Sequence, residues 1–261
     1  MVDFVKRDLK DLTILIPVRI DSLARLENIL AVIKYIDKYF DTNVFVLEAD
    51  ARNCGILNRQ ILCGVQYSYV KDCDPVFYRT KYINLMASKV ATEYLAVWDA
   101  DVILPPSQVY DSVQKLRSKQ FDFCYPYDGT FLDTSKLIRG LFLDSNDVAW
   151  LEELRDFMLA PYGLGVRGGA FLANTMQYRK VGMENLNFYG WGPEDWERYE
   201  RWMNLGARIG YSKGCLYHLS HPRDLNGMHN SSQQKMCSYY EKDLIMNSSK
   251  KEIVRHLNLF L

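Results

Sequence analysis

The sequence predicts an α/β protein whose mostly parallel central sheet is flanked by helices. Three short apolar segments, 13–16, 44–47 and 94–98, suit buried parallel strands. Amphipathic segments of helical period separate them along the first half of the chain. This alternation indicates right-handed crossovers, because parallel neighbours in one sheet need a covering connection between them.

The first half contains the clearest individual elements. The strand at 13–16 stops at Pro17, and Ser22 suits the N-cap of a helix over about 23–40. Further elements predicted in this half are a weak strand near 65–70, a helix over 79–90 and a helix over 106–119. The expected fold therefore alternates strands and helices in a regular order up to about residue 120.

The second half has a less regular pattern. Its predicted elements are a strand at 121–125, a helix near 147–159, a strand at 170–173, a helix over 194–205, a strand near 208–217 and one or two helices after residue 235. The chain shows no internal repeat, low-complexity tract or linker. We therefore expect one domain over residues 1–261.

The composition is typical of a globular protein with a sizeable core. Hydrophobic residues make up 48% and charged residues 25%, which excludes a disordered chain. Lys plus Arg and Asp plus Glu both number 32, a balance that argues against nucleic-acid binding. Residues 1–8 lack the apolar run of a signal peptide, and no segment approaches the ~18 apolar residues of a membrane span. We therefore expect a cytoplasmic protein, whose six cysteines lack C-x-x-C spacing and are expected to stay reduced.

Polar residues follow the predicted strands where each strand ends. They are Arg19, Glu48, Asp50, Asp99 and Asp101. The carboxyl edge of an open α/β sheet is where such folds bind ligands, so a nucleotide-binding first half is expected. Neither G-x-G-x-x-G nor G-x-x-x-x-G-K-[ST] follows a strand, which makes dinucleotide-binding and P-loop sites weak interpretations.

Asp99 and Asp101 form a D-x-D motif directly after the strand that ends at Trp98. Two carboxylates at this position suit a divalent cation that bridges the phosphates of a nucleotide. The motif is common by chance, and a pair of solvated loop acids is the alternative.

His218 and His221 stand three residues apart beyond the predicted strand at 208–217. Imidazole together with carboxylate is a typical ligand set for manganese, whereas magnesium prefers oxygen ligands and water. The alternative is one core histidine and one surface histidine. No H-E-x-x-H is present, and a zinc hydrolase site would need a further strong ligand.

The segment 190–195, GWGPED, is the most distinctive in the chain. Pro193 suits the start of a helix, which places Glu194 and Asp195 beside the positive end of the helix dipole. One of these carboxylates can accept a proton from a hydroxyl nucleophile. Trp191 offers a flat face for a sugar ring, and ordinary acidic capping is the alternative interpretation.

Together these motifs resemble the inverting β-1,4-galactosyltransferase family and its bacterial relatives, including chondroitin-polymerase-type transferases, all of which have the GT-A fold. The resembling segments occur in family order and cover about residues 11–224. They are 16–19 (IPVR), 77–81 (FYRTK), 98–101 (WDAD) with Leu104 and Pro105, 168–170 (GGA), 190–195 (GWGPED) and 218–224 (HLSHPRD).

The resemblance implies a GT-A fold with a Rossmann-like sheet. It makes 11–127 the nucleotide-binding half, 128–224 the acceptor and metal half, and 225–261 a helical tail. The residues it assigns to the donor nucleotide are Pro17, Val18, Arg19, Phe77, Arg79 and Asp99. The metal ligands it implies are Asp101 and His221, with His218 as a second imidazole.

The resemblance also implies the reaction. Asp195 is the general base, and Trp191, Glu194, Gly168 and Gly169 bind the acceptor and the donor sugar. The expected enzyme is metal-dependent, with Mn²⁺ or alternatively Mg²⁺. It moves galactose or N-acetylgalactosamine from a UDP-sugar to a saccharide hydroxyl, with inversion and a β linkage in the product.

The chain departs from the family at two informative places. Val166 and Arg167 replace aromatic residues near the donor sugar's 2-position, so the smaller Val166 leaves UDP-GalNAc open beside UDP-galactose. Pro193 replaces a glycine common in animal members. Animal members also carry a membrane stem and disulfides. Without these, the expectation is a bacterial enzyme that builds a capsule, lipooligosaccharide or similar glycan on a saccharide or lipid-linked acceptor.

The tail combines an apolar set, Ile253, Val254, Leu257 and Phe260, with neighbouring basic residues. Packing against the domain is expected, with peripheral contact at the inner membrane as the alternative. Two other functions stay open. One is a glycan- or nucleotide-sugar-binding protein without turnover. The other is a sugar nucleotidyltransferase, which would need a Gly-rich basic loop where this chain has 19–22.

Overall fold

The computed structural model describes residues 6–222 and 225–259, which form an α/β fold around a seven-stranded sheet. In spatial order the strands are β3 (Gln66–Lys71), β2 (Phe40–Asp50), β1 (Arg7–Val18), β4 (Tyr94–Trp98), β8 (Ala170–Asn174), β6 (Phe123–Tyr125) and β9 (Ile209–Tyr211). Strand β8 runs antiparallel to both of its neighbours, and the other adjacent pairs are parallel. The predicted mostly parallel sheet is confirmed.

A second, three-stranded sheet joins distant parts of the chain. It consists of β5 (Val102–Ile103), β10 (Leu216–His218) and β7 (Phe131–Asp133), with β10 in the middle. The prediction of one strand near 208–217 is wrong, because this segment forms β9 in one sheet and β10 in the other. Gly214, whose φ of +116° lies in the left-handed region, belongs to the turn between them.

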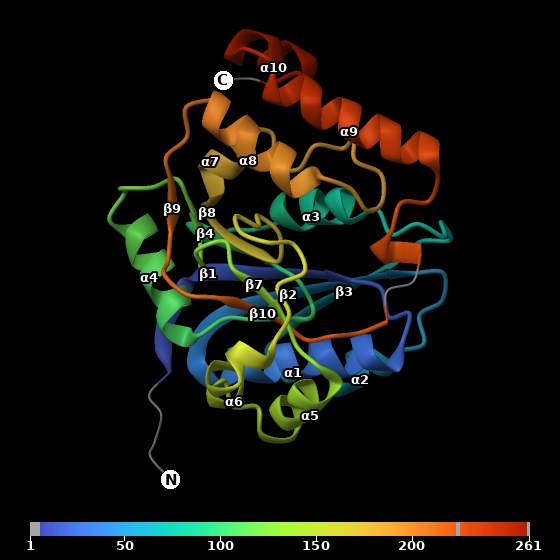
Figure 1. The fold of residues 1–261 in the computed structure, drawn as a ribbon, viewed down its shortest axis with the longest axis vertical. Coiled ribbons are helices and arrows are strands. Elements are labelled where there is room, and N and C mark those ends of the chain that lie inside the picture. The colour runs from blue at the N-terminus through green and yellow to red at the C-terminus, as the bar shows by residue number, and fades with distance from the viewer. Residues whose placement is uncertain (1–5, 223–224, 260–261) are drawn as a thin grey trace.

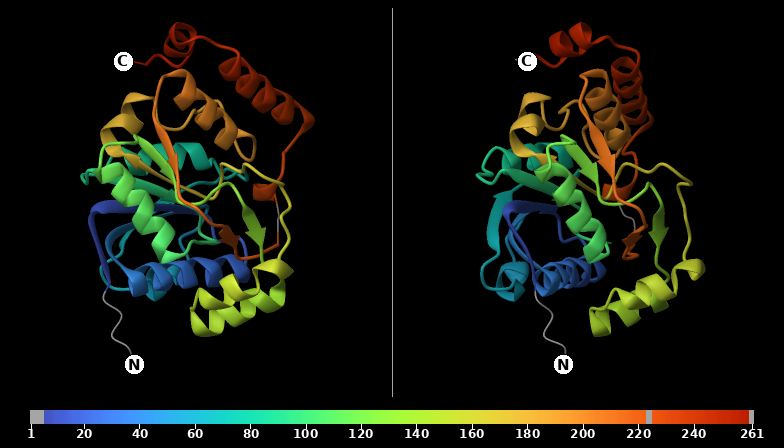
Figure 2. Two further views of the ribbon diagram at one scale, coloured as in Figure 1. Left: turned by 60° about the vertical axis from the view of Figure 1, so that its left-hand side comes forward. Right: turned by 90° about the vertical axis from the view of Figure 1, so that its left-hand side faces the viewer.

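Helices cover both faces of the large sheet. Helix α1 (Leu23–Tyr39) lies on one face, and α3 (Arg79–Ala87) and α8 (Glu194–Asn204) lie on the other (Figures 1 and 2). Helix α1 begins where the sequence predicts, since the Ser22 hydroxyl accepts the Arg25 N–H at 3.3 Å. The fully buried Trp202 of α8 stacks on Phe123 with 3.9 Å between ring centroids, which fixes α8 on the sheet.

The other helices are α2 (Ile56–Gln60), α4 (Pro106–Arg117), α5 (Lys136–Ser145), α6 (Ala149–Glu153), α7 (Thr175–Lys180), α9 (Ser232–Met246) and α10 (Lys250–His256), with 3₁₀ turns at η1 (Arg155–Phe157) and η2 (Leu225–Gly227). The predicted helix near 147–159 is too long. Leu159 pairs with Asp133 in an antiparallel bridge, so the chain is extended before it reaches residue 159. The predicted helix over 79–90 ends at Ala87.

The C-terminal segment forms two helices that lie against the rest of the chain. Helix α9 runs beside α8 (Figure 1) and buries Ser238, Glu241 and Ile245. Helix α10 buries Ile253, whereas Phe260 of the predicted apolar set lies outside the described residues. Within residues 6–222 and 225–259, no helix has the length and apolar character needed to cross a membrane.

Candidate active site

A cavity of about 430 Å³ opens at the carboxyl ends of β1 and β4. Every site residue predicted from the sequence lines it: Pro17, Val18, Arg19, Phe77, Arg79, Asp99, Asp101, Gly168, Gly169, Trp191, Glu194, Asp195, His218 and His221. Glu48 and Asp50, which the sequence also placed at strand ends, are not among the described residues that line the cavity. Glu48 instead accepts a hydrogen bond from the Tyr67 hydroxyl at 2.6 Å.

Asp101, His218 and His221 converge on one side of this cavity. The Oδ1 atom of Asp101 is 3.6 Å from His218 Nε2, and its Oδ2 atom is 3.0 Å from His221 Nε2. The three ligand atoms all lie within 4.8 Å of one another. One carboxylate and two imidazoles at this spacing fit a first-row divalent cation such as Mn²⁺.

Backbone pairing places these three residues together. Strands β5 and β10 are antiparallel with His218 opposite Val102, so the residue before Val102 lies next to the end of β10. The Leu219 N–H then donates to the Asp101 carbonyl at 2.7 Å. The segment between the two histidines is thereby tied to the D-x-D turn.

A buried asparagine in α1 also holds the segment between the two histidines. Asn28 is fully buried, and its Nδ2 donates to the Leu219 carbonyl at 2.8 Å. Its Oδ1 accepts from Arg139 Nε, also at 2.8 Å, so both ends of the amide are paired. Sequence analysis missed this residue, although a single Asn within an apolar helical stretch was a signal that could have revealed it.

Asp133 is a second residue that sequence analysis missed. Its Oδ1 lies 2.9 Å from His218 Nδ1. A carboxylate only accepts hydrogen bonds, so the imidazole donates from Nδ1, and the neutral form of His218 would then carry its lone pair on Nε2, toward Asp101. Asp133 ends strand β7, in the half of the chain whose sequence pattern is less regular, and no sequence motif marks it.

The surroundings of Asp101 keep it ionised. Burial raises the pKa of this carboxyl, but the charges of His218 and His221, a hydrogen bond from His221 and the charge of Arg25 lower it more. Arg25 Nη1 lies 3.6 Å from Asp101 Oδ2. The net pKa is below the ordinary value, so Asp101 is available as a charged ligand across the physiological range.

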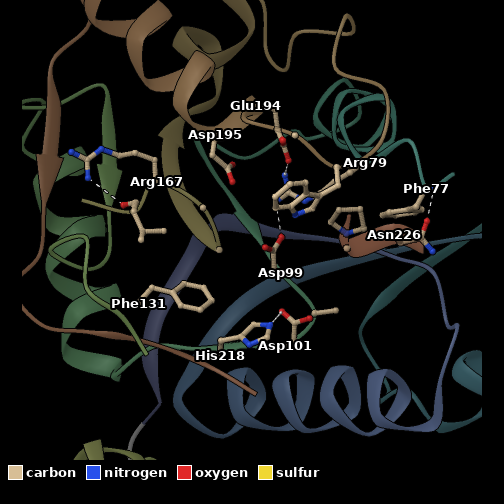
Figure 3. Close-up of a pocket in the computed structure, with 18 of the residues that line it drawn as sticks. Phe77, Arg79, Asp99, Asp101, Phe131, Arg167, Glu194, Asp195, His218 and Asn226 are labelled. Atoms are coloured by element: carbon tan, nitrogen blue, oxygen red, sulfur yellow. Dashed lines mark hydrogen bonds and ion pairs between the residues drawn. The ribbon is translucent and has the colours of Figure 1, made fainter. Parts of the chain in front are cut away.

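A chain of charged groups crosses the rest of the cavity. In Figure 3, Asp99 lies between Arg79 and Asp101, and Arg79 Nη2 donates to Asp99 Oδ1 at 2.6 Å. On its other side, Arg79 Nη1 is 3.9 Å from Glu194 Oε1. Arg79 Nη1 and Glu194 Oε2 are buried and have no hydrogen-bond partner among the described residues. Buried polar atoms in a cavity wall that lack a hydrogen-bond partner fit a site that a polar ligand completes.

Asp195 lies in the first turn of α8 and is held in place by Arg198 of the same helix. Its Oδ1 accepts from Arg198 Nη2 at 2.7 Å, and the buried Arg198 also pairs with Glu184 at 3.0 Å. A Cβ atom at residue 168 would lie 2.5 Å from Asp195 Oδ2. Only glycine therefore fits at residue 168 without moving the carboxylate.

Arg19 lines the cavity, but its guanidinium faces the protein. It donates from Nε to the Ala49 carbonyl at 2.9 Å and from Nη1 to the Asp74 carbonyl at 2.8 Å. Its Nη2 pairs with Asp72 at 2.8 Å. These bonds tie the segment before Phe77 to the end of β2, so Arg19 shapes the cavity wall.

Comparisons with known proteins agree with this fold. The family described as the N-terminal domain of galactosyltransferase matches residues 158–224. The catalytic domain of Drosophila β-1,4-galactosyltransferase 7, solved with xylobiose, is similar over 87% of this chain and 78% of that chain, with 15% identity and a TM-score of 0.54. A mutant of the same enzyme was solved with manganese, UDP-Gal and xylobiose. No curated protein sequence gave a significant match.

Two other similar structures come from different organisms. Glucosyl-3-phosphoglycerate synthase from Mycobacterium tuberculosis, solved with Mn²⁺, UDP and glucosyl-3-phosphoglycerate, shares 14% identity over 96% of this chain and 81% of that chain, with a TM-score of 0.51. A mannosyltransferase from Pyrobaculum calidifontis, solved with GDP-Man and Mn²⁺, shares 14% identity over 95% and 68%, with a TM-score of 0.57. The fold is that of the GT-A glycosyltransferases.

Glu194 is expected to make stability depend on pH. Burial, followed by the charge of Asp195, raises its pKa from 4.5 to about 8, although Arg79 acts in the opposite direction. The folded protein thus binds this proton more tightly than the unfolded chain, and stability falls as the pH rises from about 4.5 to about 8. In Glu194→Gln, the decrease in the free energy of unfolding between these two pH values should be about 2–4 kcal/mol smaller than in the wild type, as measured by urea unfolding across this range. Glu153→Gln, an exposed control on α6, should behave as the wild type; equal pH dependence in all three proteins would contradict a protonated Glu194.

Asp133→Ala is expected to weaken metal binding by about 10–100-fold, because His218 loses the partner that orients its ring. Titration calorimetry with Mn²⁺ measures this effect without any substrate. Asp156→Ala, at a carboxylate whose side chain is 87% exposed, is the matched control and should bind as the wild type does. Equal affinity in both variants would show that Asp133 has no role in orienting His218.

Proposed function

We propose that this protein is a metal-dependent glycosyltransferase that moves a hexose from a UDP-sugar to a saccharide hydroxyl. The observation that carries the proposal is the convergence of Asp101, His218 and His221 with Asp195 on one cavity of a GT-A fold. Similar structures solved with Mn²⁺ and UDP, or with manganese and UDP-Gal, support the choice of donor and metal.

The donor is expected to lie along the side of the cavity that contains the metal ligands. Asp101, His218 and His221 would hold Mn²⁺, with Mg²⁺ as the alternative. A divalent cation bound there supplies positive charge for the diphosphate and for the UDP leaving group. Arg25 and Arg79 line the same cavity and add positive charge beside it. Pro17, Val18 and Phe77 offer apolar surface for the nucleoside.

The acceptor is expected to approach the opposite side, where Asp195 is the general base. Arg198 already donates a hydrogen bond to Oδ1 of Asp195. The other oxygen, Oδ2 beside Gly168, is therefore the atom that takes the proton of the acceptor hydroxyl. The hydroxyl oxygen then attacks the anomeric carbon in line with departing UDP. One such displacement on an α-linked donor inverts the centre and gives a β linkage.

Glu194 and Trp191 complete the proposed sugar site. With a pKa of about 8, Glu194 is largely protonated at neutral pH and can donate a hydrogen bond to a sugar hydroxyl. Trp191 is 38% exposed and lines the cavity, so its face is available to a sugar ring. Gly168 and Gly169 line the same cavity, and the absent Cβ of Gly168 leaves room for the Asp195 carboxylate.

We further propose galactose or N-acetylgalactosamine as the transferred sugar, and the synthesis of a bacterial surface polysaccharide or lipooligosaccharide as the setting. Residues 1–261 would act as one GT-A domain. A lipid-linked acceptor and peripheral contact with the inner membrane through the tail belong to the same hypothesis. The packing of α9 on α8 favours the tail as part of the domain.

UDP release from a panel of UDP-sugars tests the proposed reaction. We expect one UDP-hexose to be hydrolysed slowly with Mn²⁺, and EDTA or Asp101→Asn to abolish the release. Asp195→Asn should lower turnover by about 10²–10⁴-fold while Mn²⁺-dependent UDP binding persists, because only the proton acceptor changes. Asp144→Asn, at an exposed carboxylate on α5, should leave turnover and Mn²⁺-dependent UDP binding unchanged.

The outcomes of this assay separate the alternatives. Binding of a UDP-sugar without release, even with a panel of saccharide acceptors, would favour a binding protein without turnover. Release of pyrophosphate from a nucleoside triphosphate and a sugar phosphate would favour a nucleotidyltransferase. No nucleotide binding at all would refute the metal and donor assignment.

Val166→Tyr tests the choice of donor sugar. Val166 lines the cavity near Gly168, where the family resemblance places the donor's 2-position. A larger side chain should exclude the acetamido group, so kcat/KM for UDP-GalNAc should fall by about tenfold or more relative to UDP-galactose. An unchanged ratio of the two kcat/KM values would show that Val166 does not select the donor.

A further inference from the structure

Helix α9 holds the loop that carries Trp191. The side-chain Nε2 of Gln234 donates to the backbone carbonyls of Tyr189 and Trp191, each at 2.9 Å. One amide group near the start of α9 thus bonds to the loop on both sides of Gly190. No sequence motif and no family resemblance points to Gln234.

The same helix binds the beginning of this loop through a buried charge. Glu241 is 7% exposed, and its Oε1 accepts from Asn185 Nδ2 at 2.7 Å and Asn187 Nδ2 at 2.9 Å. His256 Nε2 of α10 lies 2.8 Å from the same oxygen. Burial raises the pKa of Glu241, but these three hydrogen bonds lower it more, so Glu241 is an ionised anchor.

Packing around Trp191 connects it further to α9. The oxygen of the Gln234 amide lies 3.0 Å from His229 Nδ1, and the His229 ring meets the Trp191 ring edge-on at 4.8 Å. A Cβ atom at residue 192 would lie 3.3 Å from Ser238, so the loop passes close to α9 here. Tyr239 of α9 itself lines the cavity.

We infer that Gln234 is a positioning residue that fixes the Trp191 loop for sugar binding. The loop lies between α7 and α8 and has no strand or helix of its own over residues 185–192, so contacts from outside must hold it. Gln234 supplies these contacts on both sides of Gly190. The link to a sugar rests on the proposed function, whereas the link to loop order does not.

The experiment compares Gln234→Ala and Gln234→Glu with Gln233→Ala. A glutamate of nearly the same size cannot donate to the two carbonyls, and Gln233 is an exposed neighbour on α9. Hydrogen exchange of the full-length protein without substrate should show about tenfold faster exchange in residues 187–193 for both Gln234 variants. Exchange elsewhere, and in the whole of Gln233→Ala, should match the wild type.

Kinetics then test the consequence for the sugar site. With the UDP-hexose that the wild type hydrolyses, both Gln234 variants should raise KM about 5–20-fold while kcat changes less than about twofold. Binding of UDP with Mn²⁺ should be unchanged, because those groups contact the other side of the cavity. Gln233→Ala should keep the wild-type KM.

Each other result overturns part or all of the inference. Wild-type exchange in the loop of both Gln234 variants would show that the two hydrogen bonds do not order it. Global unfolding of both variants would assign Gln234 to overall stability. Faster exchange with an unchanged KM would remove the link to sugar binding. A wild type without turnover would refute the proposed function, while the exchange data would still decide the role of Gln234 in loop order.

Discussion

The antiparallel pairing of β5 with β10 is the constraint on which the candidate site depends. It sets His218 opposite Val102, and the adjoining hydrogen bond from Leu219 N–H to the Asp101 carbonyl fixes the two segments at 2.7 Å. A shift of this register by one residue would turn His218 to the other face of the small sheet, away from Asp101. The buried Asn28 reinforces the register from α1, because its amide would lose a buried hydrogen bond if Leu219 moved.

Burial has opposite consequences for the two acidic ends of the cavity. Asp101 and Glu194 are both buried, and burial by itself raises the pKa of each. Asp101 is surrounded by two imidazoles and Arg25, so its net pKa falls. Glu194 has Asp195 as its next neighbour and Arg79 only at 3.9 Å, so its pKa stays near 8. Neighbouring charges thus separate Asp101, which is ionised at neutral pH, from Glu194, which is largely protonated there, and the proposed metal side and sugar side of the cavity differ in the same way.

Local sequence patterns predicted much of this arrangement. The apolar strands, the D-x-D motif and the GWGPED segment all carry their signal within a few residues, and the structure brings the side chains of the two motifs to one cavity. Asn28, Asp133 and Gln234 were missed because each acts through a contact with a residue far away in the sequence. The split of the segment near 208–217 into two strands was missed for a related reason. The sharp turn that includes Gly214 redirects the chain to a second sheet, whose partner strands lie elsewhere in the sequence.

Hydrophobic patterning alone could not predict the environment of the C-terminal helices, but the structure defines it. An amphipathic tail can pack against the domain, as the sequence led us to expect, or lie on a membrane surface, because both bury one apolar face. The polar residues of α9 distinguish these environments: Glu241 is buried and bonded to Asn185 and Asn187, and Gln234 is bonded to the backbone on both sides of Gly190. A buried carboxylate with three hydrogen-bond donors is costly unless its partners stay in place, so α9 and the Trp191 loop must keep one relative position for the fold to be stable. That requirement makes the C-terminal segment part of the candidate active site, since α9 bonds to the loop between α7 and α8 that carries Trp191.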